Sequence, residues 1–490
     1  MDETKIIKNL NINLNHSFMK TLSIKQVLPF LILGVIALAS VFIPALPHFE
    51  DKTGAYQPAD IAWILVATAL VFLMTPGLAF FYGGMVHRKN VISTMIKSVV
   101  AAGIVSILWI VVGFSLAFGD SIGGFIGNPS TFLFFKNVTS GAPWSLAPTI
   151  PLTLFAFFQL MFAIITPGLV VGAVAERIRF TAYILFIALF SLLVYAPIAH
   201  WTWHPDGFLF KMGVLDFAGG TVVHISAGCA ALVGAIVLKP RKTHMEQMEI
   251  PPANIPYVLI GTGLLWFGWF GFNGGSALGA NALAVSAFAT TNIAAAAAGC
   301  SWMFFDVLRG KKPSVLGFCI GAVVGLVAIT PAAGFVAIPQ SIFIGVVAAI
   351  ISNMAVYYKT KSKLDDTLDV FPCHGIGGMV GMLMTGIFAT KAVNGAGADG
   401  LLYGNLSFFL TQLKGLAIVV AYSLVASYAI FKFIDFILPL RVSEADELQG
   451  LDASQHDEKY LQGTLVVNTP NNGLISEKHI DSESAELSFS

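Results

Sequence analysis

Residues 216–228 read DFAGGTVVHISAG and place a histidine, His224, in an otherwise apolar run. A second histidine, His374, stands in a similar setting in residues 369–381, DVFPCHGIGGMVG. The chain around them is 56% hydrophobic and 11% charged, whereas an ordinary soluble domain has about 25% charged residues. The two stretches therefore predict helices that cross a membrane and carry an ionisable side chain at depth.

The rest of the chain predicts an all-α polytopic membrane protein with eleven transmembrane helices. A span needs about 20 apolar residues, and eleven runs approach this length. They lie at 60–83, 96–118, 152–175, 180–199, 217–238, 256–278, 281–305, 314–330, 340–357, 370–390 and 412–437.

Basic residues indicate how these spans are oriented. Lys and Arg gather in every second connection, at 87–89, 177–179, 239–242, 309–312 and 359–363. The positive-inside rule assigns these connections to the cytoplasm, and we expect a bacterial plasma (inner) membrane, with its lipid as a partner. Eleven spans that start outside end inside, so the tail is cytoplasmic. A formal net charge of zero without a long basic stripe argues against nucleic acid.

The spans contain an internal repeat. FYGG at 81–84 in the first span has an echo in FNGG at 272–275 in the sixth, and His224 in the fifth has one in His374 in the tenth. Spans one to five and six to ten are therefore two copies. Because five is odd, the second copy enters from the opposite face, the inverted arrangement that places a substrate path at the repeat interface. The eleventh span is a peripheral addition.

The first 50 residues are set apart from these spans. Lys20 and Lys25 precede an apolar stretch from Val27 to about Ile43, which is typical of a secretory signal. An uncleaved extra helix is compatible with the same topology, and we favour the signal. The chain then divides into a signal or extra hydrophobic segment at 1–50, a membrane domain at 51–442 and a cytoplasmic regulatory tail at 443–490.

Each histidine follows an aspartate at the same distance, since 224 − 216 = 8 and 374 − 366 = 8. At 1.5 Å per residue each imidazole lies about 12 Å along a helix from its aspartate, which brings both rings towards the middle of a core about 30 Å thick. Ionisable groups at that depth are costly and usually functional; a hydrogen-bonded structural histidine is the alternative. Burial disfavours the charged form, so we expect a neutral pair suited to a small hydrogen-bonding solute.

The two aspartates have a different role. An offset of eight residues turns about 80° round a helix, so Asp216 is poorly aimed at His224. Its carboxylate is better placed to cap the helix N-terminus, and direct cation binding is the alternative. Asp366 takes the matching structural place before His374.

Cysteines and catalytic motifs give no sign of an enzyme. Cys229, Cys300, Cys319 and Cys373 lie in apolar segments without CxxC spacing, so we interpret them as small core residues and expect neither a disulfide nor a zinc site. No HExxH or GxSxG motif is present, and two neutral histidines without a nearby carboxylate make a poor metal site. We expect no metal, no cofactor and no catalytic residue.

Five motifs together indicate a family. They are PGLAFFYGGMVHRKN at 76–90, VGAVAERIRF at 171–180, DFAGGTVVHISAG at 216–228, GWFGFNGGSA at 268–277 and DVFPCHGIGGMVG at 369–381. Through them the chain resembles the Amt branch of the ammonium transporter family (Amt/Rh), from about Asp60 to Tyr460. The resemblance implies a homotrimer of eleven-helix protomers, each with its own narrow apolar pore.

The resemblance also implies roles for individual residues. The residues that match the family's motifs are Phe158, Phe162, Trp203 and Ser276 at an outer substrate site, Phe162, Phe272 and Trp269 at a gate, and His224 and His374 in the pore. Asp216 and Asp366 are structural residues near that path.

These residue types suit ammonium or methylammonium. Such a cation gains about 0.5–2 kcal/mol of cation–π stabilisation over aromatic rings, and a serine oxygen accepts one of its hydrogen bonds. Potassium has a similar size but donates none. Because a bare ion in a low-dielectric pore is strongly penalised, we expect deprotonation near the gate, passage of ammonia past the histidines and a proton relayed along them, in electrogenic uptake.

Other functions stay open at this point. An electroneutral ammonia or carbon dioxide channel of the Rh type is one, although a cation site argues against a gas channel. An ammonium sensor acting through its tail is another, for which residues 443–490 are short. The tail resembles the segment that accompanies docking of a PII-type nitrogen regulator, with Asp457 where the family usually has glycine.

Overall fold

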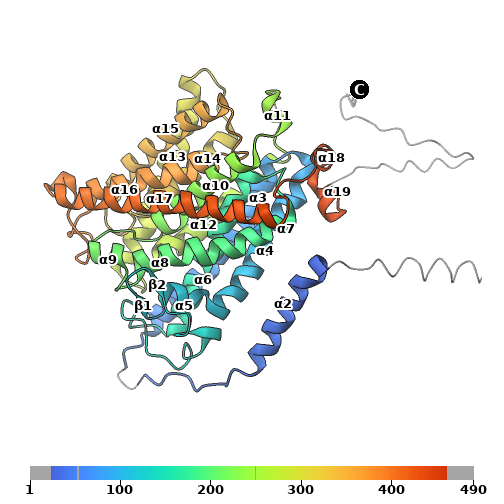
Figure 1. Ribbon diagram of the computed structural model, residues 1–490. Helices are drawn as coiled ribbons and strands as arrows, with labels where there is room; N and C mark the ends of the chain where they lie inside the picture. Colours follow the sequence, from blue (N-terminus) through green and yellow to red (C-terminus); the bar gives the residue numbers. More distant parts are fainter. Residues whose placement is uncertain (1–23, 52–53, 249, 461–490) are drawn as a thin grey trace, which may run out of the picture.

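The structure, a computed structural model, describes residues 24–51, 54–248 and 250–460 and is a bundle of helices (Figure 1). The α-helices are α2 (Ile24–Val41), α3 (Pro58–Met85), α4 (Val91–Leu108), α5 (Phe114–Phe118), α6 (Leu152–Val174), α7 (Phe180–Phe190), α8 (Ala196–Trp203), α9 (Phe208–Met212), α10 (Ser226–Leu238), α11 (Lys242–Met245), α12 (Ile255–Gly275), α13 (Ala282–Leu308), α14 (Val315–Ile329), α15 (Ile338–Thr360), α16 (Gly377–Phe388), α17 (Leu406–Ile437), α18 (Glu444–Gln449) and α19 (Leu451–His456). The other elements are the 3-10 helices η1 (Arg88–Asn90), η3 (Leu133–Phe135) and η7 (Leu401–Tyr403), the π-helices η2 (Trp109–Gly113), η4 (Ser191–Tyr195), η5 (Gly220–Ile225) and η6 (Phe371–Ile376), and a hairpin of β1 (Ser121–Ile122) and β2 (Ile126–Gly127).

The membrane-spanning character predicted from the sequence is confirmed. Ten helical segments of the described chain are long and apolar enough to cross a membrane. The sequence predicted eleven, and the difference lies at 314–330, where α14 has only 15 residues. These rise about 22 Å, less than a hydrocarbon core of about 30 Å. The chain turns at Pro331, whose ring and missing N–H cannot continue a helix.

Four of the spans contain a π-helical segment that the sequence did not predict. Two of these, η5 and η6, carry His224 and His374. The rise of 1.5 Å per residue that holds in an α-helix does not hold between each aspartate and its histidine. The residues directly after the aspartate are not helical, and those around the histidine form a π-helix. π-Helical turns are rare and occur frequently at functional sites.

The first helices of the two predicted repeats, α3 and α12, pack side by side through glycines. A side-chain carbon on Gly261 would lie 2.3 Å from the Phe81 nitrogen, and one on Gly268 would lie 2.3 Å from Cγ of Met74. Small residues let helix backbones approach each other in a membrane, where association depends on close packing. This contact joins the two predicted copies.

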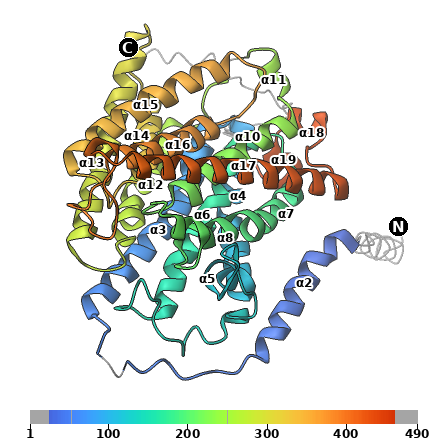
Figure 2. The ribbon, with the colours of Figure 1, turned by 60° about the vertical axis from the view of Figure 1, so that its left-hand side comes forward.

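The helices α17 and α2 differ in how they meet the bundle. α17 crosses the front of the bundle in Figure 1 and packs against α10, α16 and α7, while its other side is exposed at Val425 and Phe436. By contrast, α2 stands apart from the bundle in both views (Figures 1 and 2). The apolar side chains of α2 are largely uncovered, and Phe30 is 74% exposed. The chain after α2 is held at Phe49, whose N–H donates to a carbonyl of the loop before α6 at 3.0 Å. Residues 1–23, with Lys20 of the predicted signal, and residues 461–490 of the tail lie outside the described residues.

The prediction that all four cysteines belong to the core is wrong for one of them. Cys229, Cys319 and Cys373 are buried, but Cys300 on α13 is exposed. Apolar residues of a membrane helix face lipid as well as other helices. Hydrophobicity alone therefore does not separate the two sides of α13.

Charged connections that are far apart in the sequence meet at one end of the bundle. Arg241 donates to the Asp365 carboxylate at 2.8 Å and also to Glu176, and Arg177 lies 3.7 Å from the same Asp365 carboxylate. Burial alone raises the pKa of Asp365, but the hydrogen bonds from Arg241 and the charge of Arg177 outweigh it and hold this pKa well below its usual range. The connections that carry Arg177 and Arg241 therefore meet beside Asp365, just after the basic residues at 359–363.

The tail packs against the same end. Asp452 of α19 accepts hydrogen bonds from the backbone N–H groups of Ile92 at 3.1 Å and Ser93 at 2.7 Å. The Leu451 N–H donates to the Asn90 side chain at 2.8 Å. The first N–H groups of a helix have no partner within it, and Asn90 makes no capping bond with its own side chain. The tail thus supplies the cap of α4.

Asp457 ends α19 in the left-handed conformation, with φ 56° and ψ 33°. This is the position where the sequence resemblance leads one to expect glycine. Aspartate and asparagine enter this conformation more often than other residues with a side chain. The replacement therefore keeps the turn that a glycine would make.

Replacing Arg241 by methionine is expected to lower the free energy of unfolding by about 3 kcal/mol, because it leaves the buried Glu176 carboxylate without its cation and Asp365 with only the more distant Arg177. Thermal unfolding in detergent at pH 7 measures the loss. The Asp365 pKa is lowered on folding, so this ion pair stabilises the fold above the unfolded pKa, and the gap between wild type and variant should narrow below about pH 4. Lys242→Met is the control, because Lys242 is 56% exposed; an equal loss in this variant would contradict the assignment.

Changing Asp457 to valine should release α19, since a β-branched side chain is strained at this positive φ, whereas Asp457→Gly should leave it docked. Hydrogen exchange of the Ile92 and Ser93 amides, which Asp452 covers, should become about tenfold faster in the valine variant. Equal exchange in the two variants would show that the backbone at residue 457 does not control docking.

Candidate functional site

An outer cavity of about 90 Å³ is lined in part by α9, which lies in Figure 1 at the end of the bundle opposite α18 and α19 of the tail. It is lined by Trp144, Leu146, Phe155, Gln159, Phe162, Trp203, Phe210, Phe217, Ser276 and Leu278. Three of the predicted outer residues, Phe162, Trp203 and Ser276, are thus brought together. The fourth, Phe158, is not part of the lining; it is fully buried and its ring packs edge-on against Phe162, with centroids 4.9 Å apart.

The helical period of α6 explains this difference. Phe155, Gln159 and Phe162 are spaced by four and three residues, so they share one face of the helix, and that face lines the cavity. Phe158 turns towards Gly275. The period was available in the sequence for Phe155 and Gln159. Trp144 lies in an irregular loop without a period and had no such signal.

Two hydrogen bonds fix the polar groups of the outer cavity. The Ser276 hydroxyl donates to the Phe272 carbonyl at 2.8 Å, which leaves its oxygen free to accept a hydrogen bond. The Trp203 indole donates to the Asp216 carbonyl at 3.1 Å. The indole plane and the hydroxyl oxygen are therefore held in place at the cavity.

The carboxylates of Asp216 and Asp366 both bond to the first residues of a π-helix. Asp216 accepts from the N–H groups of Gly219, Gly220 and Thr221 at 2.6–2.8 Å, and from the Thr221 hydroxyl. Both of its oxygens are thus occupied, which is the geometry of a helix cap rather than of direct cation contact.

Asp366 repeats this arrangement at η6. It accepts from the N–H groups of Val370 at 3.0 Å and Phe371 at 2.7 Å. Burial raises the pKa of Asp366 to about 6. The two helices that carry the histidines therefore start from equivalent caps.

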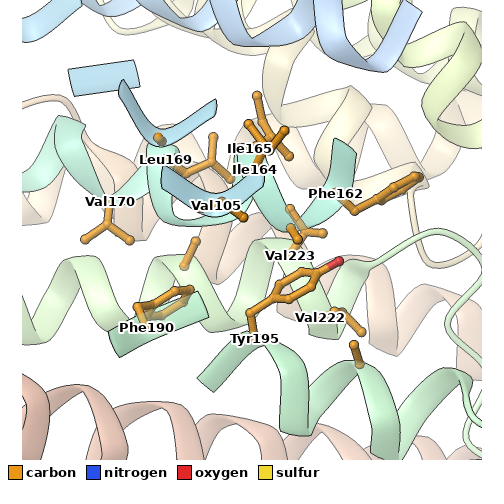
Figure 3. Close-up of a cluster of buried hydrophobic side chains, with 14 of the residues drawn as sticks. Val105, Phe162, Ile164, Ile165, Leu169, Val170, Phe190, Tyr195, Val222 and Val223 are labelled. Atoms are coloured by element: carbon orange, nitrogen blue, oxygen red, sulfur yellow. The ribbon is translucent and has the colours of Figure 1, made fainter. Parts of the chain in front are cut away.

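A pair of phenyl rings separates the outer cavity from a second, inner one. The Phe162 and Phe272 centroids lie 4.3 Å apart at 42°, and Phe162 meets Trp203 edge-on at 5.9 Å. Figure 3 shows Phe162 of α6 in the same buried cluster as Val222 and Val223 of η5. Phe162 lines the outer cavity and Phe272 lines the inner one, so the ring pair lies between the two.

The inner cavity is narrow and almost wholly apolar. Its volume is about 10 Å³, which is room for about one small molecule. It is lined by Met74, Leu78, Phe81, Ile165, Leu169, Val223, His224, Leu265, Trp269, Phe272, Val323 and His374. The indole N–H of Trp269 donates to Thr330 at 2.9 Å, so the only ring nitrogens left to face this cavity are those of the histidines.

The two histidines bond to each other across the inner cavity. Their Nδ1 atoms are 3.3 Å apart, so one ring carries the proton that the other accepts. Nε2 of His224 is buried and has no partner among the described residues. The His224 ring also stacks on Trp269, with centroids 5.4 Å apart at 21°.

A direct contact between backbones sets the distance between the histidines. A side-chain carbon on Gly228 would lie 2.2 Å from the Gly375 nitrogen. Gly228 follows His224 by one turn, and Gly375 follows His374 directly. Only glycine at residue 228 therefore allows the two helices to approach this closely. Within the described residues, no group of three His, Cys, Asp or Glu side chains is arranged to hold a metal ion.

Comparisons with known proteins agree with this architecture. The sequence profile of the Ammonium Transporter Family matches residues 62–460. The chain belongs to the ammonium transporter family. An ammonium transporter of Aquifex aeolicus is 48% identical over 402 residues, 82% of this chain and 92% of the relative. One of Bacillus subtilis is 46% identical over 412 residues, 84% of this chain and 100% of the relative.

Solved structures show the same fold. Mep2 of Saccharomyces cerevisiae matches this transporter with a TM-score of 0.78 at 34% identity, over 88% of this chain and 100% of that one. A sensor Amt protein matches with a TM-score of 0.75 at 30% identity, over 81% of this chain and 98% of that one. The bundle described above is therefore the fold of Amt and Mep2 proteins.

Replacing Gly228 by alanine is expected to separate the helices that carry the histidines and to reduce ammonium transport by at least about tenfold, because overpacking of a close contact forces the backbones apart. Transport by purified protein in liposomes measures the effect. Gly263→Ala is the matched control, since a side-chain carbon there meets nothing within 4 Å. Normal transport by the Gly228 variant would show that this contact does not set the active geometry.

Proposed function

We propose that this protein takes up ammonium, removes its proton near the phenyl pair and conducts ammonia past His224 and His374. The observation that carries the proposal is the order of the parts: an outer aromatic cavity, two phenyl rings in contact, and a narrow cavity containing two hydrogen-bonded histidines. Membership of the ammonium transporter family supports the substrate.

The outer cavity suits recruitment of a small cation. Trp203 and Phe162 present aromatic surfaces, which attract ammonium by about 0.5–2 kcal/mol as it loses water. The free lone pair of Ser276 accepts one N–H. Asp216 stabilises positive charge only from a distance, because its oxygens are used by the cap. Methylammonium keeps three N–H donors and fits the same scheme, whereas potassium has none.

The inner cavity favours a neutral molecule. An ammonium ion entering an apolar space of this size would lose its water without replacement, at a cost of several kcal/mol. Ammonia avoids this cost and bonds to an imidazole nitrogen such as Nε2 of His224, which has no partner in the described chain. The bonded Nδ1 atoms offer a relay for the proton, so we propose electrogenic uptake.

We extend the proposal to topology and partners. The end with the basic connections and the docked tail faces the cytoplasm of a bacterial inner membrane, and residues 1–50 act as a removable signal, which is compatible with the separation of α2 from the bundle. We further propose that the protein assembles as a homotrimer and that a PII-type regulator docks at its tail. Higher identity to transporters than to the sensor protein favours transport over sensing.

This function is tested with proteoliposomes on a solid-supported membrane. The ammonium concentration is raised suddenly and the resulting current is recorded. Wild type should give a current, with none for potassium, and His224→Ala and His374→Ala should each reduce it by at least about tenfold, because the relay is broken. Cys373→Ala is the control, since Cys373 is buried beside His374 in the same segment.

A wild type that gives no current but alkalinises the vesicle interior would replace electrogenic uptake by an electroneutral ammonia channel. A wild type that gives neither a current nor alkalinisation would contradict ammonium transport itself.

A further inference from the structure

The amide of Gln159 lies at the outer cavity, and its oxygen has no hydrogen-bond partner in the part of the chain that the structure describes. Gln159 lines the cavity from α6, and only 8% of the residue is exposed. Its Oε1 is buried and accepts no hydrogen bond from any described residue. The last torsion of a glutamine is broad and roughly two-fold, so the amide oxygen and nitrogen exchange places at little cost and either can face the cavity.

A buried acceptor without a partner lowers stability, and nearly all such groups in native proteins bond to protein, water or a ligand. The surroundings of Gln159 are aromatic. Phe155 and Phe162 lie one turn away on either side of the helix face, and Trp144 stacks on Phe155 with centroids 5.3 Å apart. Such an environment gives the amide no partner of its own but suits a small cation that donates hydrogen bonds.

We propose that the carbonyl oxygen of Gln159 accepts a hydrogen bond from the ammonium ion in the outer cavity, as a second acceptor beside Ser276. The inference rests on the proposed ammonium transport. Ammonium has four N–H groups, and two neutral oxygens at the edge of an aromatic cavity hold two of them. Without a carboxylate in the lining, the ion is held by dipoles and rings and is not trapped by a full negative charge.

Methylammonium separates this role from a general effect on the pore. It keeps three N–H groups, so it engages both oxygens as ammonium does. Loss of the Gln159 oxygen should therefore weaken the binding of ammonium and of methylammonium to a similar extent. A change in the inner cavity would instead affect the step after the phenyl pair. The two substrates should then respond differently, because methylamine is larger than ammonia.

The test compares currents as a function of ammonium concentration in proteoliposomes containing wild type, Gln159→Met or Gln159→Glu. The methionine variant keeps the length and flexibility of the side chain but has no oxygen, and its half-saturating concentration should rise about tenfold, with the current at saturation retained. The glutamate variant keeps the oxygens and adds charge, so its half-saturating concentration should fall below that of wild type.

Gln340→Met is the matched control. Gln340 lies at the start of α15, away from the cavity, and its amide already donates to Tyr403 at 3.1 Å. This variant should keep the half-saturating concentration of wild type. Thermal unfolding of every variant is measured beside the currents. In the absence of ammonium, Gln159→Met should be more stable than wild type, because it removes a buried amide oxygen that has no partner among the described residues.

An unchanged half-saturating concentration in Gln159→Met would overturn the inference, as would a loss of saturating current without any change in that concentration. If the methionine variant does not fold, Gln159→Glu decides alone, and a half-saturating concentration equal to or above that of wild type overturns the inference. A wild type that transports no ammonium would reject the proposed function instead, so the two failures are distinguishable.

Discussion

The first N–H groups of a helix have no partner within the helix, and in a membrane protein they have little water to bond; three aspartates supply partners for them here. Asp216 caps η5, Asp366 caps η6 and Asp452 reaches from the tail to cap α4. The first two fix where the segments with His224 and His374 begin. The depth of both rings in the bundle therefore depends on where these two carboxylates bond, although neither carboxylate belongs to the inner cavity.

The site is assembled from both predicted repeats. The first copy contributes the α6 face with Phe162 and the segment with His224, and the second contributes Phe272 of α12 and His374 of η6. Close contacts between glycine and backbone join the copies at α3 with α12 and at Gly228 with Gly375. The inner cavity beside these contacts is narrow, and the side chains that line it are buried in the bundle.

The sequence predicted the features that depend on hydrophobicity and charge. Long apolar runs predicted the spans. The basic connections predicted that segments such as those around Arg241 and Asp365 lie at the same end of the bundle. It missed features that depend on which side of a helix faces a neighbour: Cys300 is exposed although its segment is apolar, and α14 is short because the chain turns at Pro331. The π-helical turns and the Gly228 contact have no periodic signal, so the distance between the histidines could not be calculated from spacing.

Asp452 makes the position of the tail part of the energetics of a membrane helix. Pulling α19 away exposes the amides of Ile92 and Ser93, so any partner that captures the tail must compensate for a frayed first turn of α4. By thermodynamic linkage, anything that stabilises the first turn of α4 stabilises the docked tail by the same free energy. α4 packs against α6, which carries Phe162. The docked tail is therefore connected to the phenyl pair through two packed helices, α4 and α6.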